Sequence, residues 1–132
     1  MTDRKLIDMA AEVMENSYSP YSRFKVGAAI ECSDGQVYKG CSIENAAIGA
    51  SMCAEAAALA CAVSDGNRSF KRIAITSEGS AYCFPCGTCR QLLSEFSPDI
   101  EVLCSRADGR YVSYPLATLL PMVFAKEQIE SP

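Results

Sequence analysis

The sequence predicts an α/β fold in which helices cover both faces of a mixed β-sheet. The expected elements run in the order helix, strand, strand, and then helices that alternate with strands, which implies both parallel and antiparallel strand pairs. The composition, with 49% apolar and 21% charged residues, is that of an ordinary globular protein. We therefore expect residues 1–132 to form one domain with its own hydrophobic core.

The first half of the chain is expected to form a helix, a β-hairpin and a second helix. Apolar residues recur at helical spacing over residues 3–16. Residues 24–32 and 36–41 are predicted strands, and the turn between them contains a glycine that can adopt a positive φ angle. Small residues at 27–29 indicate that another backbone approaches closely there. Residues 52–64 are rich in alanine, which predicts a buried helix.

The second half is expected to supply three more strands and two more helices. Pro85 is expected to open a helix, because the first helical turn does not need its missing N–H. A short terminal helix is expected over residues 116–124. The predicted strands are residues 71–77, 100–105 and 110–114.

Charge and hydropathy argue against several classes of function. A net charge of −4 without a cluster of basic residues opposes binding to nucleic acid. No apolar run approaches the ~18 residues that a membrane span needs. The first residues lead into an amphipathic pattern and not into a secretion signal, so a cytoplasmic location is expected.

The chain contains eight cysteines, which we expect to be reduced, some of them bound to metal, because no secretion signal is visible. Four of these cysteines are expected to pack as small apolar side chains: Cys32, Cys41, Cys61 and Cys104. The other four lie in two short segments that carry the chemistry.

Three cysteines are spaced as ligands of a catalytic zinc ion. Cys86 and Cys89 lie one helical turn apart and can bind one metal together with Cys53. Three protein ligands leave the fourth tetrahedral position for water, whose pKa zinc lowers toward neutrality. Glu55 follows Cys53 by two residues in the first turn of a predicted helix, so it can reach that open side without binding the metal. This is the position of a general acid/base.

A closed structural zinc site is the alternative. Cys83 lies three residues before Cys86 and offers a fourth sulfur beside Cys53. Four thiolates would leave no position for water, and the protein would then be a non-catalytic zinc module. We favour the open site because the closed one leaves the placement of Glu55 unexplained.

Four segments of the chain resemble, in the same order, the small homotetrameric zinc-dependent cytidine deaminases. They are residues 19–29, beginning Ser19-Pro20-Tyr21, residues 40–46, the two cysteine segments with Arg90 and Gln91, and residues 119–124. The resemblance implies a three-layer α-β-α sandwich with a mixed five-stranded sheet. It also implies one zinc ion per subunit and hydrolytic deamination of cytidine and deoxycytidine in pyrimidine salvage.

The resemblance further implies roles for the residues around the metal. Phe24 would pack on the base, and Glu44, with Ser42 beside it, would accept a hydrogen bond from a ribose hydroxyl. The backbone of Ala54 would contact the attacking oxygen. Glu55 would take the proton of the water, pass it to N3 of the pyrimidine and later protonate the departing amine.

The resemblance also implies that two residues act between subunits. Phe124 and the backbone near Ala46 would reach the pocket of a neighbouring copy, so one subunit could not form a complete pocket. A homo-oligomer is therefore expected, and the resemblance makes it a homotetramer.

Three positions depart from the family pattern and keep a second substrate class open. Ser42 stands where the family usually has Asn, Ala56 where many members have Arg beside the thiolates, and Ile48 where Tyr is frequent. Arg90 is the candidate to supply the missing positive charge. The alternative substrates are modified or C4-substituted cytosine nucleosides. A nucleic-acid editing enzyme is disfavoured by the short, acidic chain.

Overall fold

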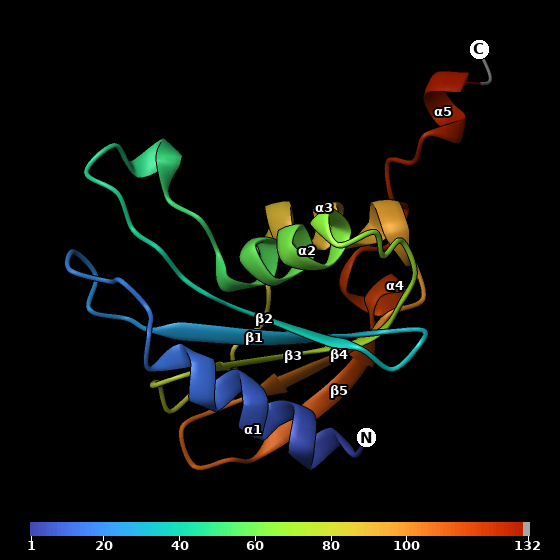
Figure 1. The fold of residues 1–132 in the computed structure, drawn as a ribbon. Helices are drawn as coiled ribbons and strands as arrows, with labels where there is room; N and C mark the ends of the chain where they lie inside the picture. The colour runs from blue at the N-terminus through green and yellow to red at the C-terminus, as the bar shows by residue number, and fades with distance from the viewer. Residues whose placement is uncertain (131–132) are drawn as a thin grey trace.

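A five-stranded sheet lies at the centre of the computed structural model, which describes residues 1–130 (Figure 1). The strands are β1 Val26–Cys32, β2 Val37–Cys41, β3 Phe70–Ser77, β4 Glu101–Ser105 and β5 Tyr111–Pro115. They lie in the order β2-β1-β3-β4-β5. Only β3 and β4 pair in parallel, and the other three pairs are antiparallel. The predicted mixed five-stranded sheet is confirmed.

Helices cover both faces of the sheet, which confirms the three-layer arrangement. Helix α1, Asp3–Met14, lies on one face, and α2, Ala54–Ser64, with α3, Gly87–Phe96, lies on the other (Figure 1). Side chains alternate between the two faces along each strand. Those packed with α1 are Ala29, Ala74 and Leu103, and those packed with α2 and α3 include Ala28, Ile30, Ile73, Ile75 and Val102.

A glycine lets a helix approach the sheet closely on each face. A Cβ atom at Gly27 would lie 2.1 Å from the carbonyl oxygen of Ala10 in α1. A Cβ atom at Gly40 would lie 2.4 Å from the backbone nitrogen of Ala58 in α2. Neither distance is sterically possible, so only glycine fits at these two positions. The close approach predicted at residues 27–29 is confirmed, and β2 receives α2 in the same way.

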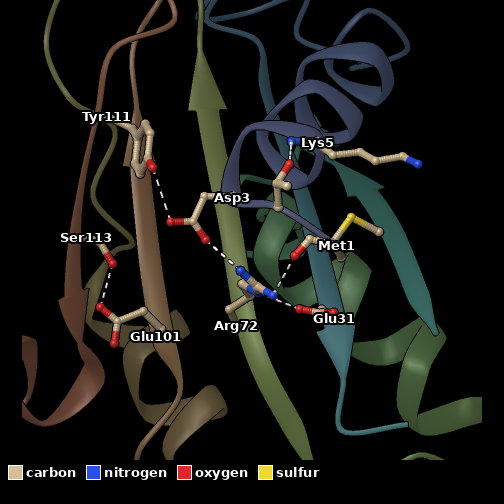
Figure 2. A network of polar contacts seen from close by, with 9 residues as sticks. Met1, Asp3, Lys5, Glu31, Arg72, Glu101, Tyr111 and Ser113 are labelled. Atoms are coloured by element: carbon tan, nitrogen blue, oxygen red, sulfur yellow. Dashed lines mark hydrogen bonds and ion pairs between the residues drawn. The ribbon is translucent and has the colours of Figure 1, made fainter. Parts of the chain in front are cut away.

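A network of polar contacts ties the start of α1 to the sheet (Figure 2). The guanidinium of Arg72 on β3 donates to Glu31 on β1 at 2.5 Å, to Asp3 at 2.7 Å and to the carbonyl oxygen of Met1 at 2.9 Å. The hydroxyl of Tyr111 on β5 donates to Asp3 at 3.1 Å. Three strands and the first helix are thereby joined through buried and half-buried charges.

The predicted boundaries of two helices were wrong, and proline explains the first. The terminal helix expected over 116–124 is only α4, Leu116–Leu119, because Pro121 has no N–H to donate and favours an extended conformation at Leu120. A separate short helix, α5, follows at Glu127–Glu130. Helix α3 begins at Gly87, since Cys86 is extended with a ψ angle of 168°, so Pro85 lies outside it.

Two smaller expectations also need correction. The first strand begins at Val26 and not at residue 24. Cys61 is exposed, because its position on α2 faces away from the sheet, whereas Cys32 and Cys104 are buried in the core as predicted. All eight cysteines are free. No helix within residues 1–130 is both long and apolar enough to cross a membrane.

Candidate active site

The thiols of Cys53, Cys86 and Cys89 form one compact cluster. Their Sγ atoms all lie within 4.8 Å of one another, and those of Cys53 and Cys86 are 3.9 Å apart. Tetrahedral zinc with Zn–S bonds of ~2.3 Å holds its sulfurs about 3.8 Å apart. The three side chains therefore fit one zinc ion with little rearrangement.

The ends of two helices position this cluster. Cys53 is the N-cap residue of α2 and Cys86 that of α3, and neither thiol caps its own helix with a hydrogen bond. Cys89 is buried in the first turn of α3. Partial burial acts to raise the pKa of Cys86, but hydrogen bonds from Cys89 and Cys53 outweigh it and leave that pKa lowered. The positive ends of two helix dipoles further favour negative charge on the sulfurs.

Cys83 does not belong to the cluster. Within the described chain the group of thiols able to share one metal contains three members, and Cys83 is not among them. Burial raises the pKa of its thiol to about 11, and a hydrogen bond with Ser77 opposes that rise. This arrangement favours the open three-thiolate site over the closed four-thiolate alternative.

Glu55 is a buried carboxylate beside the cluster. Its side chain is 5% exposed, and none of the ion pairs within residues 1–130 involves it. Burial raises its pKa, while hydrogen bonds to its own backbone N–H and to Cys89 act in the opposite direction. Ala54 precedes it as the first residue of α2, where a backbone N–H has no acceptor inside the helix. Both groups are placed to act on a ligand at the metal.

A cavity of about 310 Å³ opens in front of these groups. Its lining includes Ser22, Phe24, Ser42, Glu44, Cys53, Ala54, Glu55 and Cys86. The predicted metal, base and sugar residues are thus brought together around one space. A larger hollow of about 520 Å³ lies among Ser33, Ser69 and Phe96 and contains none of them, so size does not identify the site.

Two predicted residues lie elsewhere. Phe124 is 59% exposed, does not line the cavity, and follows α4 in the segment whose backbone accepts a hydrogen bond from Gln91 at 2.8 Å. Ala46 is exposed in the loop before the short 3₁₀ helix η1, Ile48–Ala50. Neither residue contributes to the cavity of its own chain.

The two polar side chains of the sugar region are already engaged by the protein. The hydroxyl of Ser42 lies 2.6 Å from that of Ser17 and accepts the N–H of Val26 at 3.1 Å. The carboxylate of Glu44 accepts the backbone N–H groups of Tyr21 at 2.9 Å and Ser22 at 3.1 Å. The hydroxyl of Ser22 donates to the same carboxylate.

Sequence reasoning assigned no role to Ser22, although it lies within a segment that carried the family resemblance. Only the position of Ser22 opposite Glu44 signals its involvement. Arg90, the expected source of positive charge, donates to the carbonyl oxygens of Pro85 at 2.8 Å and Leu119 at 2.7 Å. Its guanidinium therefore links the backbone just before Cys86 to the backbone at the end of α4.

Comparison with known proteins agrees with this site. Residues 1–104 match the family described as "Cytidine and deoxycytidylate deaminase zinc-binding region". A cytidine deaminase of Sporosarcina psychrophila is 42% identical over 130 residues, which cover 98% of this chain and 96% of that protein. The crystal structure of cytidine deaminase from Burkholderia pseudomallei has a TM-score of 0.91 at 41% identity and covers 94% of this chain and 100% of that one.

A more distant relative carries a different name. Blasticidin-S deaminase of Bacillus cereus is 30% identical over 132 residues, covering 94% of this chain and 93% of that protein. The α-β-α fold and the three-thiol cluster with its buried carboxylate define a zinc-dependent deaminase class. The chain belongs to the cytidine and deoxycytidylate deaminase family.

Proposed function

We propose that the protein deaminates cytidine and deoxycytidine hydrolytically, giving uridine or deoxyuridine and ammonia. The observation that carries the proposal is the buried carboxylate of Glu55, which has no cation partner within residues 1–130, beside three thiols that fit zinc. Zinc bound to those thiolates supplies an activated water by lowering its pKa. The 42% identity to a cytidine deaminase over nearly the whole chain supports the choice of substrate.

The residues of the chain divide the remaining work. Glu55 accepts the proton released by the attacking water at one carboxylate oxygen and delivers it to N3 of the base. It then takes the remaining proton from the new hydroxyl on C4 and passes it to the amine, so that the C4–N bond breaks as the C4 carbonyl forms and ammonia leaves. Burial raises the pKa of Glu55 above its usual value, which is the direction that suits a group that must both take and give a proton. The N–H of Ala54 donates to the attacking oxygen. Phe24 packs on the base, and Glu44 accepts from the sugar.

The proposed assembly is a homotetramer with shared active sites, acting in pyrimidine salvage in the cytoplasm. Support comes from Phe124, which is exposed and absent from its own cavity although the family resemblance assigns it to the pocket. The high exposure of Ile48, at 85%, at the start of the 3₁₀ helix η1 also suits a subunit contact. A closed symmetric assembly would bury both.

The assay for the proposed activity follows the ultraviolet absorbance of cytidine, deoxycytidine, cytosine and a cytosine-containing oligonucleotide. We expect turnover of the two nucleosides only. Glu55→Gln should lower kcat by at least ~10²-fold while retaining one zinc per chain, because the residue moves protons and does not bind the metal. Near-normal turnover by zinc-loaded Glu55→Gln would contradict the assignment.

Subunit complementation tests the shared site. Glu55→Gln and Phe124→Ala are each expected to be nearly inactive alone, whereas co-expressed chains should regain part of the activity. In a mixed assembly some cavities combine an intact Glu55 with an intact Phe124 of a neighbour. No recovery in assemblies proven to contain both chains would contradict a shared pocket.

Deamination of modified or C4-substituted cytosine nucleosides is the second candidate. It is favoured by the 30% identity to a blasticidin-S deaminase and by the Ser42 hydroxyl, which is committed to Ser17 and Val26. Blasticidin S and a C4-substituted cytidine belong in the same assay. A kcat/KM for either that exceeds the value for cytidine would replace the first candidate with this one.

A further inference from the structure

The hydroxyl of Ser22 joins two parts of the proposed substrate site. It donates to Oε2 of Glu44 and accepts the backbone N–H of Phe24 at 3.0 Å. A serine hydroxyl has a single hydrogen to donate, so its donor capacity is used by Glu44. All three residues line the same cavity as Glu55 and Cys53.

Counting the lone pairs of Glu44 identifies the oxygen that is open to a ligand. Oε1 accepts two backbone N–H groups, from Tyr21 and Ser22, and each carboxylate oxygen offers about two acceptor positions. Oε2 accepts only the Ser22 hydroxyl among the hydrogen bonds of the described chain. A sugar hydroxyl that binds Glu44 must therefore bind Oε2, next to the hydroxyl of Ser22.

The same contacts hold the loop that carries Phe24. Arg23, between Ser22 and Phe24, has a φ angle of +59°, a left-handed conformation that is unfavourable for arginine. The loop is held by the Glu44 carboxylate and by a hydrogen bond from the Arg23 N–H to the Ser19 carbonyl oxygen at 3.0 Å. Hydrogen bonding by Ser22 also keeps the pKa of Glu44 below its usual range, so the acceptor stays ionised.

Ser42 also lines the cavity near Glu44, but its hydroxyl does not bind the Glu44 carboxylate. Its hydroxyl is bound to Ser17 at 2.6 Å and to the Val26 N–H at 3.1 Å, which fixes it against the backbone of β1. The carboxylate of Glu44 is thus left as the main polar partner for a sugar hydroxyl on this wall, and Ser22 is the side chain that orients it.

We propose that Ser22 is a positioning residue that couples recognition of the sugar to placement of the base. Its hydroxyl directs the open lone pair of Glu44 Oε2 toward a sugar hydroxyl and holds the backbone of Phe24, whose ring packs on the base. The inference rests on the proposed nucleoside deaminase function. It predicts that the preference of the enzyme among sugars depends on the side-chain hydroxyl of Ser22.

The test compares kcat and KM for cytidine, 2′-deoxycytidine and 3′-deoxycytidine in the zinc-loaded full chain and in Ser22→Ala. For the wild type we expect the analogue that lacks the hydroxyl bound by Glu44 to be the poorer substrate. We expect Ser22→Ala to raise KM for cytidine about tenfold, with less effect on kcat, and to reduce the preference over that analogue about tenfold. Ser22→Thr, which keeps the hydroxyl, should restore the preference.

Ser33→Ala is the matched control, because Ser33 is an exposed serine whose hydroxyl also forms a side-chain hydrogen bond, with the hydroxyl of Ser69 at 2.7 Å, and neither of these serines lines the cavity. It should change neither parameter. If Ser22→Ala fails to fold, Ser22→Cys replaces it, since a thiol is only a weak donor.

A purely structural role for Ser22 would lower the melting temperature and reduce activity on all three nucleosides equally. An unchanged preference in folded Ser22→Ala, or failure of Ser22→Thr to restore it, would therefore overturn the inference while leaving the proposed function intact. A wild-type enzyme that turns over none of the nucleosides would instead overturn the proposed function, and the inference with it.

Discussion

Glu31 and Glu55 are two buried carboxylates on opposite sides of the same sheet, and they differ in how their charge is met. Glu31 is 3% exposed and receives the guanidinium of Arg72, which also binds Asp3 (Figure 2). Glu55 is 5% exposed and takes part in none of the ion pairs of residues 1–130. On the α1 side, the buried carboxylate is paired with a cation. On the α2 side, the buried carboxylate of Glu55 has no such cation.

This difference separates a buried carboxylate that stabilises the fold from one that is available for a proposed catalytic role. The Glu31 carboxylate is paired with Arg72, which also binds Asp3 and so holds the start of helix α1 on the sheet. A carboxylate that is desolvated without a cation has a raised pKa and faces a cavity lined by thiols. Burial alone therefore does not indicate a functional group, whereas burial at a cavity without a paired cation makes a carboxylate a candidate for one.

The largest expected effect is on the α2 side, where removing a thiol should abolish zinc binding. Cys53→Ala, Cys86→Ala and Cys89→Ala should each lose both zinc and turnover, because the metal would keep only two protein ligands. Zinc content by elemental analysis and kcat are the measurements. Cys83→Ala is the matched control and should retain zinc and activity, since Cys83 lies outside the cluster. Loss of zinc in that variant would revive the four-thiolate site.

On the α1 side, Arg72→Met should destabilise the protein without impairing catalysis. It leaves Glu31 buried without its cation, which we expect to cost about 3 kcal/mol in the free energy of unfolding measured with urea. The kcat at a temperature where the variant is folded should stay unchanged. The double variant Glu31→Leu with Arg72→Met should recover most of the loss. A large fall in kcat would mean that the polar network on the α1 face affects catalysis on the α2 face.

Gly27→Ala and Gly40→Ala compare the two sides by displacing one helix each. A Cβ atom would collide with α1 in the first variant and with α2 in the second, so each should lose at least ~1–3 kcal/mol of stability. Only Gly40→Ala should also weaken zinc affinity, because α2 carries Cys53. Gly49→Ala, with nothing within 4 Å of its new Cβ atom, controls for the substitution itself. Equal zinc affinity in both variants would contradict the comparison.

The smallest expected effect is a pH dependence in the zinc-free protein. Because burial raises the pKa of Glu55 in the folded state, folding is most favoured where Glu55 is protonated. Stability should therefore fall as the pH rises from the usual carboxyl pKa of ~4.3 to the raised value, by at most ~1.4 kcal/mol per pH unit.

Glu55→Gln should remove this slope, measured as thermal stability across that range. Glu31→Gln serves as its counterpart on the paired side and should leave the slope in place. A slope that persists in Glu55→Gln would assign it to another group.

The features that could be predicted from sequence are those set by neighbours along the chain. The short spacing of Cys86 and Cys89 brings their two thiols together, one at the N-cap of α3 and one in its first turn, and Glu55 follows Cys53 closely enough to lie beside the same cluster. The alternation of apolar residues and the glycine turn located the hairpin. Local geometry sufficed in each case, because residues a few positions apart in a helix or strand have nearly fixed relative positions.

The remaining features depend on segments that are distant in sequence, and their placement follows from the sheet. Arg72 meets Glu31 because β1 and β3 pair in a register that sets these two residues opposite each other. Ser22 precedes β1 and Glu44 follows β2. Because β1 and β2 pair antiparallel, these two segments lie at the same end of the sheet, where Tyr18 pairs with Ile43. The exclusion of Cys83 from the metal cluster likewise depends on how the loop after β3 packs. Spacing along the chain cannot specify such contacts, because strand register and loop packing are set by the core as a whole.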